Sequence, residues 1–279
     1  MRLPLDIRQR LTEIGKADDG DIDLGLVALF LAAGDRPGVP LEPYLRHLDG
    51  LAADVRAYAG GTEPDPGLDL RIEALVHIIV RRYGYGGTDA VFDDLDAANL
   101  MRVIDSRQGL PVAIGILFIV TARALGWDIS GLDFPGRFLV RLEAGGARKI
   151  LDPFAGGAEI KAPDMRGMFK AVAGNHVELT PGDYLDMSNR GILLRLQGNI
   201  KSRLLRGKRW DDALEVIETM TLFAPGEAEL WREAGLLHNR LNHVAEAVRA
   251  LEEYLRRTGG GEARYNASVL LQELRARPN

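Results

Sequence analysis

The segment 105–154 decides the fold, and it reads DSRQGLPVAIGILFIVTARALGWDISGLDFPGRFLVRLEAGGARKILDPF. Within it, residues 111–125 are apolar on almost every side. A helix that is hydrophobic all round is either a core helix or a membrane span, and a span needs about 20 residues. Because this run is shorter, we expect a buried central helix that begins at Pro111 and is ended by Gly126.

The hydrophobic period changes after this helix. Apolar residues alternate with others through 138–142, the glycine pair 145–146 interrupts the pattern, and residues 149–151 resume it. Alternation broken by a glycine pair is typical of a β-hairpin. Strands are expected at 129–132, 138–142 and 149–151. The predicted fold class is α+β and mostly helical, with a small antiparallel sheet packed on helix 111–125, followed by an all-α tail.

Three blocks of this segment carry a family resemblance. They are Arg107-Gln108-Gly109-Leu110-Pro111, Phe134-Pro135-Gly136-Arg137-Phe138-Leu139-Val140 and Leu151-Asp152-Pro153-Phe154. Their order resembles the transglutaminase-like core, in which a nucleophilic Cys begins a buried helix and His and Asp follow on adjacent strands. The resemblance is closest to the bacterial SirB1 family, which joins such a core to tetratricopeptide repeats.

The chain departs from this family at the positions that carry chemistry. The Cys position falls on Pro111 and the His position falls on Arg137, while the Asp position is retained as Asp152. A thiol at a helix N-terminus is a nucleophile because its pKa is lowered there, and proline has no such chemistry. Since the chain contains no cysteine, cysteine catalysis is excluded. The three residues are therefore expected to mark a degenerate cleft in a pseudoenzyme.

Composition bounds the class of protein. The 279 residues carry a net charge of −5, with a pI near 5.6, which argues against general nucleic-acid binding. The absence of cysteine removes disulfides and thiolate metal sites and fits a reducing compartment. Residues 22–33 are apolar but follow four aspartates, where a signal peptide needs positive charge. We therefore expect a cytoplasmic protein without a membrane or nucleic-acid partner.

Helical periodicity accounts for most of the remaining chain. Helices are expected at 5–14, 23–33, 42–58, 68–83, 94–105 and 164–172, and loops at 60–67 and 83–87. Thr180-Pro181-Gly182-Asp183 marks a boundary. Two domains are therefore expected, a helical N-terminal region with the transglutaminase-like core at 1–180, and helical repeats at 181–279.

The tail contains an internal repeat. Four pairs of residues are 34 positions apart: Ala213 and Ala247, Leu214 and Val248, Ile217 and Leu251, and Pro225 and Gly259. Thirty-four is the tetratricopeptide period, and Trp231 and Gly235 also fall on consensus positions. Because about three repeats are needed for independent stability, two and a half repeats predict a tail that depends on the core domain.

Other catalytic or metal-binding patterns are weak. His238 and His243, two of five histidines, are five residues apart, which puts them on different helix faces or across a turn. Ser106, the one hydroxyl near the start of the central helix, has no nearby base, and residues 198–202 lack the upstream glycine of a phosphate loop. We expect surface or turn histidines, a capping serine, no metal site and no cofactor.

Arg137 and Asp152 are expected within hydrogen-bond reach, either as a structural ion pair or as a fixed charge pair in a ligand cleft. Two functions follow. The chain is either a non-catalytic scaffold that mediates protein–protein interaction, or a hydrolase or transferase that reuses the cleft around Asp152 without cysteine chemistry.

The tail offers a candidate partner surface. In stacked repeats the first helices build the concave side, here near residues 192–206 and 228–240. Their polar residues are Arg195, Asn199, Lys201, Arg203, Arg206, Arg232, His238, Asn239 and Arg240. Asn199, Arg203, Arg232 and Asn239 are predicted to form a groove for an acidic peptide. The competing interpretation is structural, with the repeats packed on the core and these side chains in solvent.

Overall fold

The computed structural model describes residues 3–61 and 65–276, so Pro64 of the expected 60–67 loop lies outside it. Its contacts divide the chain into two compact units. The core unit comprises residues 22–196, and the tail unit comprises the described residues up to Asp21 together with those from Gln197 onward. The expected division was at 180, whereas here the core unit extends to Leu196. The N-terminal helix Leu5–Ile14 packs on the helix Trp210–Phe223 of the tail unit.

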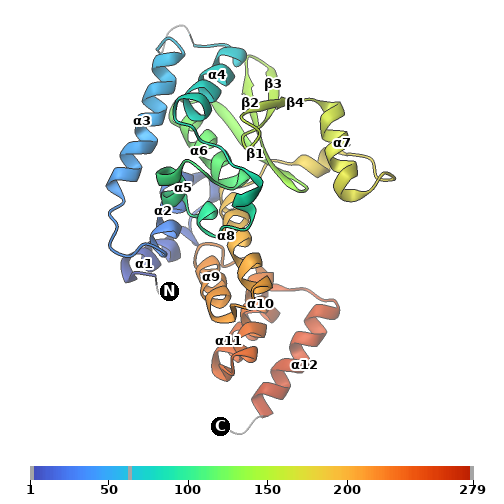
Figure 1. Ribbon diagram of the computed structural model, residues 1–279. Helices are drawn as coiled ribbons and strands as arrows, with labels where there is room; N and C mark the ends of the chain where they lie inside the picture. Colours follow the sequence, from blue (N-terminus) through green and yellow to red (C-terminus); the bar gives the residue numbers. More distant parts are fainter. Residues whose placement is uncertain (1–2, 62–64, 277–279) are drawn as a thin grey trace. The chain divides into compact units, whose positions relative to one another are not determined.

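The core unit is built around helix α6 (Pro111–Ala124), drawn in green in Figure 1. Its residues from Val112 to Ile119 are all buried. The helix contacts α2 (Leu24–Ala33), α3 (Glu42–Tyr58) and α4 (Leu68–Leu75) as well as two strands. Neighbours on all sides explain why the sequence of this helix lacks a polar face, and the prediction of a buried central helix is confirmed.

A four-stranded antiparallel sheet in the order β1-β2-β3-β4 follows α6. The strands are β1 (Asp128–Phe134), β2 (Arg137–Ala144), β3 (Ala147–Asp152) and β4 (Ala158–Ile160). Val140 is opposite Gly131 on one side and Leu151 on the other. The predicted hairpin and sheet are confirmed, and β4 is an addition because three residues are too few for a recognisable alternation.

The two faces of β2 pack against different helices. Phe138 lies against α6 at Gly115, where an added Cβ would lie 2.2 Å from Phe138 Cε1. The next residue, Leu139, belongs to a cluster with Met165 and Phe169 of α7 (Ala162–Ala173). Since successive strand residues point to opposite faces, α6 packs on one face of β2 and side chains of α7 pack on the other.

One expected helix is wound in two ways. Residues 68–83 begin as α4, but Val76–Arg82 form a π-helix, closed by a hydrogen bond from Tyr83 N to Ile78 O of 2.9 Å. Apolar spacing does not distinguish an α-turn from a wider π-turn, so the sequence could not predict this. The remaining elements of the core unit are 3₁₀ turns Asp89–Phe92, Asp96–Ala98 and Pro181–Tyr184, α5 (Leu100–Ser106) and the beginning of α8.

The tail unit consists of paired helices. They are α1 (Leu5–Ile14), a 3₁₀ turn (Asp19–Asp21), the end of α8 (Asn189–Arg206), α9 (Trp210–Phe223), α10 (Ala228–Arg240), α11 (Val244–Arg257) and α12 (Glu262–Ala276). Helix α9 contacts α1 and α10, and α11 contacts α10 and α12. The prediction of an all-α tail is confirmed.

Small residues bring the repeat helices close together, as the 34-residue period predicts. Ala213 and Ala247 are fully buried, as are Ile217 and Leu251. A Cβ at Gly235 of α10 would lie 2.8 Å from Leu251 of α11, so only glycine fits this contact without a shift. Gly15, directly after α1, likewise allows a close approach to α9, because a Cβ there would lie 2.2 Å from the carbonyl oxygen of Leu222.

Candidate functional site

Arg137 and Asp152 lie on neighbouring strands and form an ion pair. Arg137 Nη1 donates to Asp152 Oδ2 at 2.6 Å. The Asp152 side chain is 2% exposed and that of Arg137 is 47% exposed. The expected contact is confirmed, and the cation reaches from the surface to a buried anion.

The second oxygen of Asp152 organises the turn after β3. Oδ1 accepts hydrogen bonds from the backbone N–H groups of Phe154 and Ala155, both at 3.0 Å. The carbonyl oxygen of Asp152 accepts from Gly157 N at 2.9 Å. With three donors on its carboxylate, Asp152 is satisfied within the fold, and buried polar groups are normally paired in this way.

Arg195 of α8 forms hydrogen bonds to residues on both sides of the turn between β1 and β2. Its guanidinium donates to Asp133 Oδ1 at 2.9 Å and to the carbonyl oxygens of Phe134 and Arg137 at 3.2 and 2.5 Å. It also lies over the ring of Phe138. Burial lowers the pKa of Arg195 despite the nearby carboxylate. Arg195 was among the polar residues expected on the concave side of the repeats, but its side chain binds the sheet of the core unit.

Pro111 occupies the first position of α6 and supplies no donor or acceptor side chain. The segment before it is held by backbone contacts, since Gly86 N donates to Arg107 O and Gly109 N donates to Gly86 O. A Cβ at Gly87 would lie 2.2 Å from the Phe154 ring and 2.8 Å from Gly109 O. Gly87 is therefore packed between the ring of Phe154, in the turn after Asp152, and the segment that precedes α6.

A polar cluster beside this segment escaped the sequence reasoning. His47 of α3 lies 2.6 Å from the hydroxyl of Tyr85 and 3.0 Å from Arg107 Nη1, and Arg107 also contacts the Tyr85 hydroxyl. Burial and the neighbouring Arg107 lower the pKa of His47. Burial raises the pKa of Tyr85 far above its usual value. Only Arg107 stood in a recognisable motif, because His47 is sixty residues away in the chain.

The predicted groove residues lie on two helices of the tail unit. Arg203 Nη1 donates to the carbonyl oxygen of Asn199 at 2.9 Å, one turn earlier on α8. Arg232 and Asn239 are two turns apart on α10 and so share a face. Arg232 Nε donates to both carboxylate oxygens of Glu229 at 2.9 Å, which raises the pKa of Arg232 and lowers that of Glu229.

Other basic residues expected on this face are engaged elsewhere in the tail unit. Lys201 forms an ion pair with Glu233 of 2.5 Å that joins α8 to α10. Arg240 stacks over the Trp210 ring at 4.1 Å. His238 is buried and faces Glu218 of α9. Lys201, Arg240 and His238 are therefore each bound by a residue of the tail unit itself.

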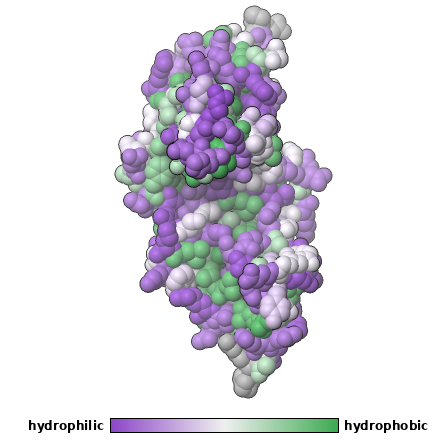
Figure 2. All heavy atoms as spheres, turned by 90° about the vertical axis from the view of Figure 1, so that its right-hand side faces the viewer, coloured by the Kyte–Doolittle hydropathy of each residue, from purple (hydrophilic) through white to green (hydrophobic). Residues whose placement is uncertain are grey.

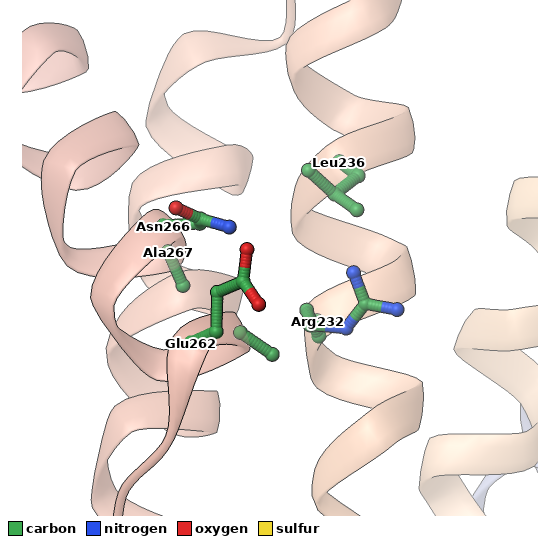
Figure 3. A pocket seen from close by; sticks show the side chains of 6 residues that line it. Arg232, Leu236, Glu262, Asn266 and Ala267 are labelled. Carbon is green, nitrogen blue, oxygen red and sulfur yellow. The ribbon is translucent and has the colours of Figure 1, made fainter.

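Arg232 also lines a pocket between α10 and α12, shown in Figure 3. The pocket measures about 290 Å³ and is lined by Arg232, Leu236, Glu262, Ala263, Asn266 and Ala267. The Arg232 guanidinium and the Leu236 side chain come from one helix, and the Glu262 carboxylate and Asn266 amide come from the facing helix (Figure 3). The pocket thus combines an exposed apolar side chain with both a cation and an anion.

Two expectations concern metals and membranes. Among residues 3–61 and 65–276, no group of three or more His, Asp or Glu side chains could hold a metal ion. No helix in the part of the chain that the structure describes is long and apolar enough to cross a membrane. His238 and His243, however, meet across the turn between α10 and α11, with their Nδ1 atoms 3.4 Å apart.

Comparison with known proteins gives two family matches. Residues 42–198 match the transglutaminase-like superfamily, and residues 200–272 match a tetratricopeptide repeat family. The first match contains the complete sheet and the Arg137–Asp152 pair, and the second contains α9, α10 and α11 in full.

Individual relatives agree with these matches. A "UPF0162 protein" of Xylella fastidiosa is 27% identical over 87% of this chain and 86% of its own length. A UPF0162 protein of Pseudomonas aeruginosa is 31% identical over 62% of each chain. "Protein SirB1" of Salmonella typhimurium is 26% identical over 63% of this chain and 66% of its own. The resemblance inferred from three short blocks is therefore confirmed.

Proposed function

Because this chain belongs to the transglutaminase-like superfamily and yet contains no cysteine, we propose that it is a non-catalytic scaffold that binds another protein in the bacterial cytoplasm. In this proposal the core unit retains the transglutaminase-like fold but not the cysteine and histidine used in cysteine catalysis. The tetratricopeptide tail supplies the interaction surface.

The ion pair of Arg137 with Asp152 carries this proposal. Arginine stays protonated at any physiological pH and donates only, so it cannot take a proton as a general base does. It binds one oxygen of Asp152 at 2.6 Å, while two backbone N–H groups bind the other. A histidine at this place would supply a base to a nucleophile, whereas this arginine supplies a fixed cation. The pair therefore maintains the turn and leaves no acid–base group in its place.

The alternative, a hydrolase or transferase that uses Asp152, has less support. General-base catalysis needs an accessible carboxylate within hydrogen-bond reach of the substrate. Asp152 is 2% exposed and is bound by three donors. Reaction at this carboxylate would require loss of the ion pair and of the turn beyond β3.

We place the partner on the first helices of the tail, at Asn199, Arg203, Arg232 and Asn239. Guanidinium groups bind carboxylates in a two-pronged geometry, and amide side chains bind extended main chains. The pocket beside Arg232 adds the exposed Leu236, which suits an acidic segment that also carries an apolar side chain. Figure 2 shows hydrophobic side chains bordered by hydrophilic ones on the tail unit, a mixture typical of interaction surfaces.

The contact between Arg232 and Glu229 sets the character of the interaction. An incoming carboxylate must displace the carboxylate of Glu229 from Arg232 or share the guanidinium with it. Glu229 is on the same helix as Arg232 and is partly exposed. Exposed ion pairs are weak and screened by salt. We therefore expect an interaction that weakens steeply as ionic strength rises.

The test is affinity capture with the tag-free full chain coupled to a resin, followed by mass spectrometry. The triple variant Asn199→Asp, Arg203→Glu, Arg232→Glu reverses the groove. Its matched control is Arg256→Glu, which changes an exposed arginine of α11 that also pairs with a glutamate three residues earlier.

Partners retained by Arg256→Glu and lost from the triple variant support the groove. If every partner survives the triple substitution and circular dichroism shows an intact fold, the groove is not the binding site. Independently, turnover of ester, amide or transamidation substrates that is abolished by Asp152→Asn would favour the enzymatic alternative over the scaffold.

A further inference from the structure

We propose that Arg107, held by His47 and by the rings of Tyr83 and Tyr85, is a binding site for a carboxylate group on the core unit. One terminal nitrogen of the guanidinium is fixed by these neighbours, and its other N–H groups face solvent. The partner groove proposed above lies in the tail unit, so this site does not depend on the scaffold function.

Two irregular segments of backbone meet at the site. Residues Val76–Arg82 form the π-helix, and Tyr83 follows it directly. Arg107 ends α5 in the left-handed region, with φ of 64°. Gly86 joins the two segments, because its N–H donates to Arg107 O at 3.1 Å and its carbonyl oxygen accepts from Gly109 N at 3.0 Å. Both π-turns and left-handed residues other than glycine are concentrated at functional sites and ligand clamps.

The guanidinium of Arg107 is held in a fixed direction. Its Nη1 lies 3.0 Å from His47 Nε2 and also contacts the hydroxyl of Tyr85. Its central carbon lies 4.8 Å from the centre of the Tyr85 ring and 5.6 Å from that of the Tyr83 ring. Aromatic faces attract a cation at such distances. Because Tyr85 is itself buried, the position of the guanidinium is set before any ligand binds.

His47 supports the cation without adding a second charge. Burial and the charge of Arg107 lower the pKa of His47, so the imidazole is neutral at neutral pH. A neutral ring can accept a hydrogen bond at Nε2, and this nitrogen also lies 2.6 Å from the Tyr85 hydroxyl. Arg107 is therefore the single charged group among these side chains.

The carboxylates nearest in the fold are bound to other cations. Asp105 Oδ2 accepts from Arg36 Nη1 at 2.5 Å, and Asp54 Oδ2 lies 3.4 Å from Arg82 Nη1. Within residues 3–61 and 65–276, no carboxylate oxygen lies within 4.0 Å of the Arg107 guanidinium. Each of the other two arginines is balanced by an aspartate, and Arg107 retains one positive charge in excess.

The open edge of Arg107 determines the class of ligand. Its Nε and Nη2 groups donate to no acceptor in the described part of the chain, and they are not buried, so they are available from solvent. Parallel N–H groups of a guanidinium match the two oxygens of a carboxylate. One excess charge also matches a monoanion. A phosphate group carries about 1.5–2 negative charges at neutral pH and would be only partly balanced here.

The carboxylate can come from a small organic acid or from a side chain of a bound protein. Both sources make the same contact with Arg107, and they differ in what surrounds the carboxylate. The competing explanation is that Arg107 only braces the loop 83–87 against α3. A brace contributes to stability but binds no added anion.

The experiment follows the Nε–H signal of Arg107 by NMR in the full chain at neutral pH. Sodium acetate is titrated at constant ionic strength against sodium chloride. We expect a saturable shift of this signal with acetate at millimolar concentrations and no such shift with chloride. The signal reports on this residue alone, so binding of an anion to the tail unit does not interfere.

A second titration distinguishes the two sources. It uses a short peptide with blocked ends and a single glutamate, and its glutamine counterpart as the control. Tighter binding of the glutamate peptide than of acetate assigns the site to a protein carboxylate. Binding of acetate that is equal or tighter assigns it to a small organic acid.

Variants identify the group that binds. Arg107→Gln removes the charge and should weaken acetate binding about 10- to 100-fold, as loss of a charged hydrogen-bond partner does. Arg107→Lys retains the charge but not the planar fork, so it should bind between the wild type and Arg107→Gln. The matched control is Arg82→Gln at the neighbouring arginine, which is paired with Asp54 and should bind like the wild type. For the variants, binding is read from the acetate-dependent shifts of the neighbouring Tyr85 and His47 signals.

Two outcomes overturn the proposal. One is the absence of a saturable shift with either acetate or the glutamate peptide in the folded wild-type chain. The other is equal acetate binding by the wild type and by a folded Arg107→Gln or Arg107→Lys variant. A lower melting temperature of Arg107→Gln together with no effect of acetate on the wild type would show that Arg107 is a structural brace.

Discussion

Arg137 on β2 and Asp152 on β3 are joined by a hydrogen bond of 2.6 Å between Nη1 and Oδ2. The pair stands where the family's catalytic His and Asp would meet. An arginine here connects the two strands through Asp152, and a guanidinium donates only, so it cannot act as a general base.

The first prediction concerns the stability of this pair. Removing one partner of a buried ion pair costs about 3–5 kcal/mol, and we expect less for Arg137→Ala, about 1–3 kcal/mol, since half of this side chain is in solvent. Asp152→Ala should cost more than Arg137→Ala, because it also leaves the N–H groups of Phe154 and Ala155 without their acceptor. Urea unfolding measures both.

A double-mutant cycle completes this test. Asp152→Asn keeps an oxygen for the two N–H groups and removes the charge, so it separates the ion pair from the turn. Arg137→Ala should have almost no effect in the Asp152→Asn background. Additive losses would mean that the two side chains do not interact in solution.

The second prediction concerns the contact between α6 and β2. Gly115→Ala places a Cβ 2.2 Å from Phe138 Cε1 and must displace a fully buried ring. Overpacking of this kind costs about 1–3 kcal/mol. The matched control is Gly198→Ala in α8, where a Cβ meets nothing within 4 Å and should stabilise by up to about 1 kcal/mol through helix propensity. Equal melting temperatures for the two variants would contradict the close packing described here.

The third prediction concerns pH. The pKa of His47 is lowered in the folded state by burial and by Arg107, so the unfolded chain binds a proton more readily near pH 6.5. The contribution of His47 is therefore complete above that pH, and stability should fall as pH decreases below it. His47→Gln, which can still reach the Tyr85 hydroxyl, should lose less stability over the same range. If the urea midpoints of the wild type and of His47→Gln change by the same amount between pH 5 and 7.5, His47 does not contribute to stability in this way.

The fourth prediction concerns catalysis. Pro111→Cys restores the family's residue at the start of α6 but leaves Arg137 at the base position. A thiol without a base or a second activating group remains a poor nucleophile, so the variant should show no transamidation or protease turnover. Iodoacetamide reactivity verifies that the new thiol is accessible. Turnover by Pro111→Cys alone would show that a base other than residue 137 serves this position.

The core of the fold was predictable because its determinants are local. An apolar run without a polar face indicates burial on all sides, and alternation around a glycine pair indicates a hairpin. The 34-residue period likewise identified the repeats from the spacing of Ala213 and Ala247 alone. Strand ends were less accurate, and β4 was missed, because hydrogen bonding to a neighbour extends a strand beyond its own pattern.

The polar partners of side chains were predictable only where a family motif joined them. Arg137 and Asp152 were paired through the resemblance. Arg195 was assigned to the groove because its helix was known, but its direction was not. Lys201 and Arg240 were assigned to the same surface, yet Glu233 and Trp210 bind them. A helical pattern predicts which residues share a face of a helix, but it does not predict which residues that face contacts.

The sequence by itself determined the buried helix, the sheet, the repeats and the absence of cysteine chemistry, because each depends on residue type or on spacing along one element. Only the tertiary structure decided that His47 meets Tyr85 and Arg107, that Glu218 meets His238, and that His238 and His243 converge at 3.4 Å. These contacts join different elements or depend on the direction of a turn. They are set by the packing of whole helices, and no local period in the chain records that packing.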